Sequence, residues 1–427
     1  MLLKLKKSET HGSIIIPGSK SHTIRALFIA SLAGGRSVIT NPLLSADALS
    51  AVNVCQSFGI KFENGEECFI VHGSDGSPSV PEDVIDVGNS GTSLRFAMMT
   101  AGLIDGCTVF TGDYQIRKRP LGSLIRTMNE LGGYVFSTRG NDMAPVVVKG
   151  RLKGGKAQLD AVTSQYLSAI LINAPLLDTD TEIVITRLNE VPYAEMTMWW
   201  LNNQGIKYEN DRFKTIYIKG GQKYKPFDIS IPGDFSSATF FMVLAAISGG
   251  TFLLKNLNIN DSQGDKKVLD YLQEMGAAVQ YSEEGIMIKG NGLKGIEIDM
   301  NSTPDALPAM AVAGCFAEGE TRLVNVPQAR MKETDRIHIM CEELSKMGAN
   351  IEELPDGLIV RNSKLRGCRV NGYDDHRIVM ALAVAGLNID GETIIETAEA
   401  INVTFPAFPQ LIRECGGNIE LIEEDQI

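Results

Sequence analysis

Apolar residues along this chain gather into six helix-length stretches, and each stretch follows a strand-like segment and a polar cluster. The two clearest copies are residues 14–41 (IIIPGSKSHTIRALFIASLAGGRSVITN) and 229–256 (ISIPGDFSSATFFMVLAAISGGTFLLKN). Both predict a strand, a Pro-Gly, an Ala-rich helix, a Gly-Gly and a second strand. Four weaker copies have the same order: residues 86–112, 159–187, 299–325 and 370–396. The copies begin about every 70 residues, so the chain is predicted to hold six repeats of one unit.

A second, amphipathic kind of helix lies between the Ala-rich ones. Residues 120–131, 266–275 and 336–347 carry apolar side chains at i, i+3, i+4 and i+7 and charged ones opposite. Each is followed by Gly and a strand, as in residues 277–290 (AAVQYSEEGIMIKG), where Glu-Gly predicts a hairpin. The unit is therefore strand, buried helix, strand, outer helix and hairpin. We expect an α/β fold of two similar lobes, each with three units around buried helices.

The starts of the six Ala-rich helices are polar. A helix N-terminus exposes N–H groups and carries about half a positive charge, so it attracts anions. The residues at the starts are Lys20 and Ser21; Asn89, Ser90, Gly91 and Thr92; Thr163, Ser164 and Gln165; Asp234, Ser236 and Ser237; Asp305; and Asp375, His376 and Arg377. Each is explained singly as a helix cap, and Asp234 with Ser236 has only that role or a lobe contact. Two lobes that face each other would bring all six starts to a shared cleft.

Five cations turn these caps into the hypothesis of an anion-binding site. They are Lys20, Arg119, Lys332, Arg336 and Arg377. Thr334 and Asp335 indicate a helix start, around which Glu333 would join Lys332 and Arg336. Pro120 suits a first helical position, which would place Arg119 just before another helix start. Gly91 lacks a Cβ, so a ligand could approach its backbone closely.

Composition narrows the classes of function. The 427 residues predict two to three domains, and 44% apolar with 22% charged residues is typical of a folded globular protein. The formal charge of −12 argues against nucleic-acid binding, although a local basic cleft on an acidic surface remains possible. Seven cysteines without a CxxC pair indicate reduced thiols in the cytoplasm. No apolar run approaches the ~18 residues of a membrane span, and no histidines have metal-ligand spacing.

The motifs taken together resemble the EPSP synthase family of enolpyruvyl transferases. They are PGSKSHTIRA at 17–26, GNSGTSLR at 88–95, RKRP at 117–120, TSQYLSA at 163–169, PDA at 304–306, KETDR at 332–336 and DDHR at 374–377. The resemblance implies a discontinuous lobe of residues 1–15 plus 229–427, a second lobe of 16–228, and an active site in the cleft between them. It also implies a cytoplasmic monomer that moves the enolpyruvyl group of phosphoenolpyruvate to the 5-hydroxyl of shikimate 3-phosphate. Phosphate is released and no cofactor or metal takes part.

The resemblance carries roles onto matching positions of this sequence. Asp305 would accept the hydroxyl proton, Glu333 would carry a proton, and Lys20 would touch both substrates. The implied contacts to shikimate 3-phosphate are Lys20, Ser21, Arg25, Thr163, Ser164, Gln165, Tyr193, Asp305 and Lys332. The implied contacts to phosphoenolpyruvate are Lys20, Gly91, Arg119, Gln165, Arg336 and Arg377. Four positions depart from the pattern: Glu190 stands where a Ser commonly contacts the phosphate, Val403 where many members have Lys, Phe96 where Pro is frequent, and Gln328 where the family has Asn.

Three alternatives stay open from the sequence. An enolpyruvyl transferase for UDP-N-acetylglucosamine would have a reactive Cys five residues before Arg119, where this chain has Tyr114. A paralogue for another phosphorylated cyclitol is favoured by Glu190, because a carboxylate repels a phosphate unless it points away. A non-catalytic binding protein is disfavoured, because both Asp305 and Glu333 are present.

Overall fold

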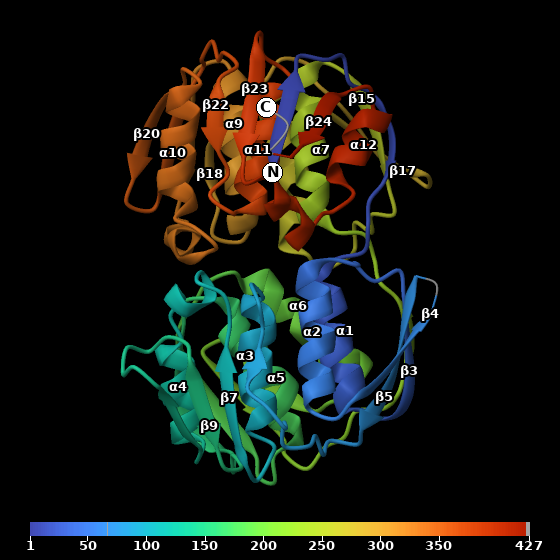
Figure 1. Ribbon diagram of the computed structural model, residues 1–427, viewed down its shortest axis with the longest axis vertical. Coiled ribbons are helices and arrows are strands. Elements are labelled where there is room, and N and C mark those ends of the chain that lie inside the picture. The colour runs from blue at the N-terminus through green and yellow to red at the C-terminus, as the bar shows by residue number, and fades with distance from the viewer. Residues whose placement is uncertain (66, 424–427) are drawn as a thin grey trace. The chain divides into compact units, whose positions relative to one another are not determined.

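The chain divides into two compact units in the computed structural model, which describes residues 1–65 and 67–423 (Figure 1). The first unit holds Met1–Pro17 and Pro232–Ile427, and the second holds Gly18–Ile231. The chain passes from one unit to the other after residue 17 and after residue 231, two and three residues later than the expected boundaries 15/16 and 228/229. The second boundary is later because β14 (Asp228–Ser230) pairs in parallel with β3 (Gly34–Thr40) and so belongs to the second unit.

The second unit contains three four-stranded sheets and six α-helices. The sheet orders are β14-β3-β5-β4, β6-β7-β9-β8 and β10-β11-β13-β12. The remaining strands are β4 (Lys61–Gly65), β5 (Cys68–Ser74), β6 (Ile85–Asp86), β7 (Cys107–Thr111), β8 (Tyr134–Ser137), β9 (Val146–Lys149), β10 (Gly155–Ala161), β11 (Thr181–Leu188), β12 (Tyr208–Asp211) and β13 (Thr215–Ile218). The helices are α1 (Lys20–Leu32), α2 (Ala46–Ser57), α3 (Gly91–Ala101), α4 (Gly122–Glu130), α5 (Ser164–Asn173) and α6 (Val191–Asn203).

The first unit repeats this architecture. Its sheet orders are β22-β23-β1-β24, β16-β17-β15-β2 and β18-β19-β21-β20. Its strands are β1 (Leu2–Lys6), β2 (Gly12–Ile15), β15 (Thr251–Lys255), β16 (Ala278–Ser282), β17 (Gly285–Lys289), β18 (Glu297–Asp299), β19 (Glu320–Val324), β20 (Asn350–Leu354), β21 (Gly357–Arg361), β22 (Arg369–Asn371), β23 (Glu392–Glu396) and β24 (Asn418–Ile422). Its helices are α7 (Phe235–Ser248), α8 (Val268–Glu274), α9 (Leu307–Phe316), α10 (Arg336–Lys346), α11 (His376–Gly386) and α12 (Phe408–Glu414).

The order of strand, helix, strand, helix and hairpin is confirmed in five of the six copies. In the copy from β10 to β13, β10 pairs in parallel with β11, and β13 pairs antiparallel with both β11 and β12. Two copies exchange their first strands: β2 precedes α1 but pairs with β15, and β14 precedes α7 but pairs with β3. The sixth copy takes its last strand from the N-terminus, because β1 lies between β23 and β24.

The Ala-rich helices form the core of each unit, as the apolar pattern predicts. In the second unit α3 packs against both α1 and α5, and in the first unit α7, α9 and α11 pack against one another (Figure 1). Every residue of α7 from Phe235 to Ala246 is buried, which explains why its sequence shows no polar face. The outer helix α4 instead buries Leu124, Ile125 and Met128 and exposes Arg126.

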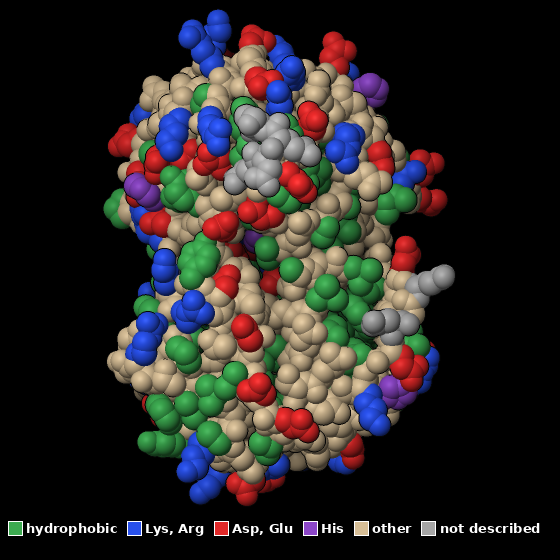
Figure 2. All heavy atoms as spheres, in the orientation of Figure 1, with side chains coloured by type: hydrophobic (Ala, Val, Ile, Leu, Met, Phe, Trp, Pro, Cys, Tyr) green, Lys and Arg blue, Asp and Glu red, His purple; other side chains and the backbone are tan. Residues whose placement is uncertain are grey.

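The surface of the face drawn in Figure 2 carries Lys and Arg interspersed with Asp and Glu, so the net negative charge forms no single patch there. All seven cysteines are free thiols. Within residues 1–65 and 67–423, no helix has the length and apolarity needed to span a bilayer.

Candidate active site

Five of the six buried helices begin with a side-chain cap. Ser19, Ser90, Thr163, Asp234 and Asp375 accept hydrogen bonds from the backbone N–H of His22, Ser93, Gln165, Ser237 and Arg377, respectively. The start of α9 differs, because a 3-10 turn (Pro304–Ala306) precedes it and neither Thr303 nor Ala306 provides a side-chain cap. Asp305 lies in that turn. The cap interpretation therefore accounts for Asp234, whereas Asp305 needs another explanation.

Lys20 and Arg25 lie one turn apart on α1 and have different surroundings. The Lys20 Nζ lies 3.1 Å from the Asp47 carboxylate on α2, and 16% of the Lys20 side chain is exposed. Arg25 is buried, and burial lowers the pKa of its guanidinium to about 10, an effect that Tyr193 partly offsets. Lys20 therefore retains access to solvent, while Arg25 is enclosed by protein.

The Arg25 guanidinium makes four hydrogen bonds to the protein. Nε donates to Thr197 Oγ1 at 2.8 Å, and Nη1 donates to the carbonyl of Ser21 at 3.0 Å. Nη2 donates to Ser168 Oγ at 3.1 Å and to the carbonyl of Tyr193 at 3.0 Å. The structure thus brings the expected residues Ser21, Arg25 and Tyr193 together, and it links α1, α5 and α6 through one side chain.

Gly91 is the first residue of α3 and faces two guanidinium groups. A Cβ added at Gly91 would lie 2.5 Å from Arg119 Nη1 and still closer to Arg95 Nη1. Arg95 is buried and donates from Nη1 to Gln165 Oε1 at 2.9 Å. Burial lowers the pKa of Arg95, and the nearby charge of Arg119 lowers it further, against the opposing effect of Tyr166. An anion beside Gly91 would relieve this repulsion between like charges.

The expected helix start at Pro120 is wrong. Arg119 follows a 3-10 turn (Ile116–Lys118), and α4 begins two residues after Pro120, at Gly122. The Pro120 carbonyl accepts a hydrogen bond from Tyr166 Oη at 2.5 Å, and the Leu121 N–H donates to the carbonyl of Asp142 at 2.7 Å. These contacts hold the segment outside the helix. Arg119 nevertheless reaches Gly91, so its position beside α3 does not depend on a helix start of its own.

The start of α5 is occupied by Glu190. The Glu190 Oε2 atom accepts hydrogen bonds from Thr163 Oγ1 at 3.0 Å, from the Ser164 N–H at 3.1 Å and from Ser164 Oγ at 2.8 Å. Glu190 is only 2% exposed. The carboxylate therefore points at Thr163 and Ser164, the two residues expected to hold a phosphate.

In the first unit Arg336 is enclosed by three carboxylates. Its Nε lies 2.8 Å from Asp375 Oδ2, its Nη1 lies 2.8 Å from Asp305 Oδ1, and its Nη2 lies 2.5 Å from Glu333 Oε2. Burial lowers the pKa of Arg336, but attraction to Asp375, Glu333 and Asp305 outweighs burial and raises the pKa above its ordinary value. Arg336 is 1% exposed, so these ion pairs are shielded from solvent.

Asp305 in turn is surrounded by three cations of the same cluster. Arg336 Nη1 lies 2.8 Å from its Oδ1, Arg377 Nη2 lies 3.1 Å from its Oδ2, and Lys332 Nζ lies 3.7 Å from its Oδ1. All five residues expected in this unit, from KETDR, DDHR and PDA, are thereby brought together. Asp335 caps α10 by accepting from the His338 N–H at 3.0 Å, as the expected helix start requires.

Comparison with known proteins identifies the family. The model of the family described as EPSP synthase (3-phosphoshikimate 1-carboxyvinyltransferase) matches residues 5–412. This chain belongs to the EPSP synthase family. Proteins named 3-phosphoshikimate 1-carboxyvinyltransferase are 65% identical in Ruminiclostridium cellulolyticum and 63% identical in Acetivibrio thermocellus, each over 99% of this chain and 100% of the relative. A solved EPSP synthase structure from Acinetobacter baumannii superposes with a TM-score of 0.83 at 28% identity, over 99% of this chain and all of that chain.

The resemblance noted from the motifs is thus confirmed, as is the two-unit α/β fold of this family. Arg95 and Asp265 are two of the residues near the clusters that were absent from the sequence-based site. Arg95 lies four residues after Gly91 on α3, a spacing that places both on one helix face and that could have revealed it. Asp265 had no such signal: it is buried, accepts a hydrogen bond from Ser236 Oγ, and has its pKa raised by burial and then by Asp305.

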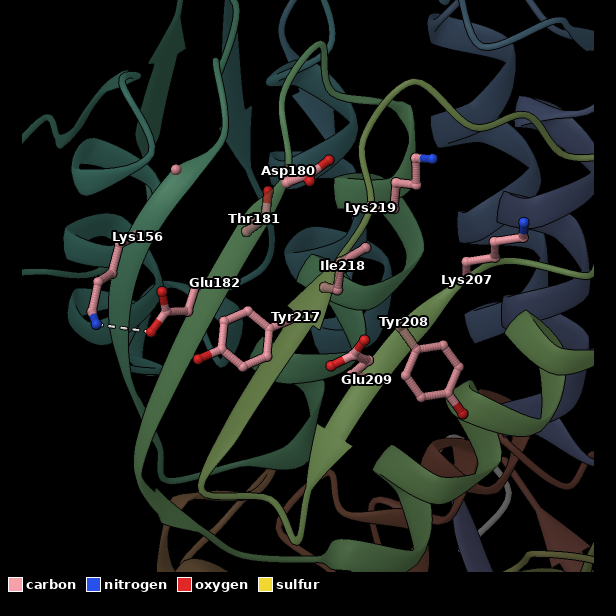
Figure 3. A pocket seen from close by; sticks show the side chains of 11 residues that line it. Lys156, Asp180, Thr181, Glu182, Lys207, Tyr208, Glu209, Tyr217, Ile218 and Lys219 are labelled. Carbon is pink, nitrogen blue, oxygen red and sulfur yellow. Dashed lines mark ion pairs between the residues drawn. The ribbon is translucent and has the colours of Figure 1, made fainter.

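A hollow of about 730 Å³ lies elsewhere in this member of the EPSP synthase family, on the sheet β10-β11-β13-β12. Figure 3 shows Tyr208, Tyr217 and Lys219 around it, with an ion pair of 2.8 Å between Lys156 and Glu182. The hollow includes Gly155 and Thr181, at the amino ends of the parallel strands β10 and β11. Thr163 and Glu190 follow the carboxyl ends of those strands. The hollow is therefore separate from the residues at the start of α5.

Proposed function

We propose that the protein transfers the enolpyruvyl group of phosphoenolpyruvate to the 5-hydroxyl of shikimate 3-phosphate and releases phosphate. The observation that carries this proposal is the Asp305 carboxylate, which lies against three cations in a chain of the EPSP synthase family. Relatives at 65% and 63% identity over the whole chain carry the name 3-phosphoshikimate 1-carboxyvinyltransferase.

The substrates carry phosphate and carboxylate groups, which suit the cations of both units. Arginine binds such groups through two parallel hydrogen bonds. Arg119, beside Gly91 and Gln165, and Arg336 with Arg377 are the proposed contacts for phosphoenolpyruvate. The proposed contacts for shikimate 3-phosphate are Ser21, Arg25, Thr163, Ser164, Gln165, Tyr193, Asp305 and Lys332, and Lys20 serves both substrates.

The reaction is an addition followed by an elimination. Asp305 accepts the proton of the 5-hydroxyl as its oxygen bonds to C2 of phosphoenolpyruvate, and Glu333 donates a proton to C3. Glu333 then takes a proton back from C3 as the bond between C2 and the phosphate oxygen breaks, which restores the double bond, and the proton on Asp305 passes to the released phosphate. General acid–base assistance of this kind contributes roughly 10²–10⁴ in rate. Phosphoenolpyruvate is already activated, so the mechanism uses no cofactor.

The finer assignments are part of the same proposal. The enzyme works on these two small molecules as a monomer in the cytoplasm, without nucleic-acid or membrane partners. Seven free thiols support a reducing compartment. A monomer would show a mass of 46.4 kDa by light scattering after size-exclusion chromatography.

The decisive experiment measures phosphate release by the purified protein. With shikimate 3-phosphate and phosphoenolpyruvate together, we expect phosphate and one equivalent of enolpyruvyl product; with either substrate alone, or with shikimate instead of its phosphate ester, we expect none. A folded protein that releases no phosphate above background contradicts the proposal. Tight phosphoenolpyruvate binding without turnover would instead favour another phosphorylated cyclitol, the second candidate, which the carboxylate of Glu190 at Thr163 and Ser164 supports.

A further inference from the structure

Glu190 directs its side chain away from the helix that it precedes. It immediately precedes α6 in the left-handed region, at φ 58° and ψ 43°, and its side chain does not cap α6. Four residues that follow the second strand of other repeats share this left-handed backbone: Asn41, Asn256, Asn325 and Thr397. The Glu190 side chain reaches to the start of a different helix, α5, 26 residues earlier in the chain. The backbone conformation is therefore common to the repeats, and what distinguishes this position is a carboxylate directed at the α5 N-terminus.

One carboxylate oxygen takes three donors at that N-terminus. Two hydroxyl groups, of Thr163 and Ser164, and one backbone N–H, of Ser164, all point to Glu190 Oε2. Hydrogen bonds to a charged acceptor are stronger than neutral ones, and the positive end of the α5 dipole adds to them. The oxygen therefore occupies the position in which these groups would hold an oxygen of a phosphate.

The same donors cannot serve both anions at once. Each of the two hydroxyls has a single hydrogen, as does the Ser164 N–H, so a hydrogen donated to Glu190 is not available to a ligand. A phosphate placed beside the carboxylate would also be repelled by its charge. Glu190 has a cation nearby, because Arg95 is close enough to be attracted to it. A displaced carboxylate thus has a favourable direction in which to move.

We propose that Glu190 competes with the substrate phosphate for Thr163 and Ser164 and so controls the occupancy of the phosphate position. This inference rests on the proposed function, in which those two residues hold the 3-phosphate. In the free protein the carboxylate occupies the phosphate position, and shikimate 3-phosphate must displace it. A ligand with many other contacts can still bind when it must displace the carboxylate, whereas inorganic phosphate, which has none, then binds too weakly to occupy the position. Glu190 therefore lowers the affinity for every phosphate at this position by the same factor, and only ligands with enough other contacts occupy it.

Two substitutions test the competition by titration calorimetry. Glu190→Gln has the same shape and retains an oxygen acceptor for the α5 donors, but it has no charge. Glu190→Ser removes the competing acceptor altogether. We expect Kd for shikimate 3-phosphate to fall at least tenfold in Glu190→Ser and to fall in Glu190→Gln, while Kd for shikimate changes less than twofold. Inorganic phosphate at matched ionic strength should raise the melting temperature of both variants more than that of the wild type.

The matched control is Glu182→Gln on β11, where a carboxylate pairs with Lys156 at 2.8 Å. This substitution should change neither the affinity for shikimate 3-phosphate nor the affinity for inorganic phosphate. Weaker binding of shikimate 3-phosphate to folded Glu190 variants would mean that the carboxylate holds the substrate, and unchanged binding would mean that it does not compete; either result overturns the inference. The inorganic phosphate measurement separates the two proposals. If the wild type releases no phosphate from phosphoenolpyruvate but the variants bind inorganic phosphate more tightly, the proposed function fails and the competition stands.

Discussion

Gly91→Ala tests whether the space beside α3 holds an anion. Gly91 is the first residue of a helix and has no left-handed backbone, and alanine is the better helix former, so the fold should tolerate the change. The added Cβ would lie 2.5 Å from Arg119 Nη1, and an ordinary contact begins at 3.4 Å. The guanidinium of Arg119 must therefore retreat by about 0.9 Å, and that of Arg95 must also move. Both are ends of flexible side chains, so stability changes little while the anion position is altered.

The magnitude follows from the bonds that the displaced groups would make to a ligand. A hydrogen bond to a charged group contributes about 1.5–3 kcal/mol, and each 1.4 kcal/mol is a factor of ten. Loss of one such bond from Arg119 or Arg95 predicts an increase in KM for phosphoenolpyruvate of roughly 10–100-fold. The three atoms nearest to the new methyl group belong to Arg95 and Arg119, and of the proposed contacts for shikimate 3-phosphate Gln165 is hydrogen-bonded to Arg95, so KM for shikimate 3-phosphate should rise much less than KM for phosphoenolpyruvate.

Steady-state kinetics with each substrate varied in turn measure this split. Gly386→Ala is a matched control, because a Cβ added to that helical glycine would lie 3.0 Å from the Thr393 side chain. This substitution should change the melting temperature without a selective increase in KM for phosphoenolpyruvate. If Gly91→Ala is folded and its KM for phosphoenolpyruvate stays within twofold of the wild type, the space between Gly91, Arg95 and Arg119 is not the anion position.

Two further substitutions test the acidic residues of the first unit. Asp305→Asn should lower the single-turnover rate constant by a factor of about 10²–10⁴. The binding of phosphoenolpyruvate should not weaken, because Arg336, Arg377 and Lys332 remain. A rate constant within tenfold of the wild type would exclude a proton-acceptor role. Asp265→Asn tests a pKa that burial and then Asp305 raise above the ordinary 3.8. The unfolded chain releases this proton at a lower pH than the folded one, so the wild type should lose stability relative to Asp265→Asn as pH rises from 4.5 to 7.5. Urea unfolding that gives the same difference at both pH values would contradict this.

The repeat architecture could be predicted from the sequence because its signals are local. The all-round apolar character of α7 and the two-sided pattern of α4 depend on residues within one helix. Strand pairing across a large sequence separation has no such local signal. The Phe252↔Gly12 register of β15 with β2 joins the N-terminus to the middle of the chain, and the insertion of β1 between β23 and β24 joins its two ends. The family resemblance, rather than periodicity, indicated that the N-terminal residues join the C-terminal half.

The membership of the two clusters could be predicted from motifs, but the partners within them could not. Arg336 was expected to face a ligand, yet its partner Asp375 lies 39 residues later and was expected only at a helix start. Glu190 was recognised as a departure from the family pattern, but its direction depends on a left-handed backbone that sequence patterns do not specify. The same limit applies to Pro120, whose residue type suits a helix start while tertiary hydrogen bonds place it outside α4.

Capping separates the acids at the helix starts by function. The Asp234 carboxylate accepts hydrogen bonds from the N–H and the hydroxyl of Ser237, and this helix cap explains why an acid stands at this helix start. Asp375 does both, since it caps α11 and pairs with Arg336. Asp305 lies at a start that Thr303 and Ala306 leave uncapped by their side chains, and its carboxylate faces Arg336, Arg377 and Lys332. In the proposed function the anionic groups of the substrates attract those same cations, which would link ligand binding to the release of the Asp305 carboxylate as proton acceptor.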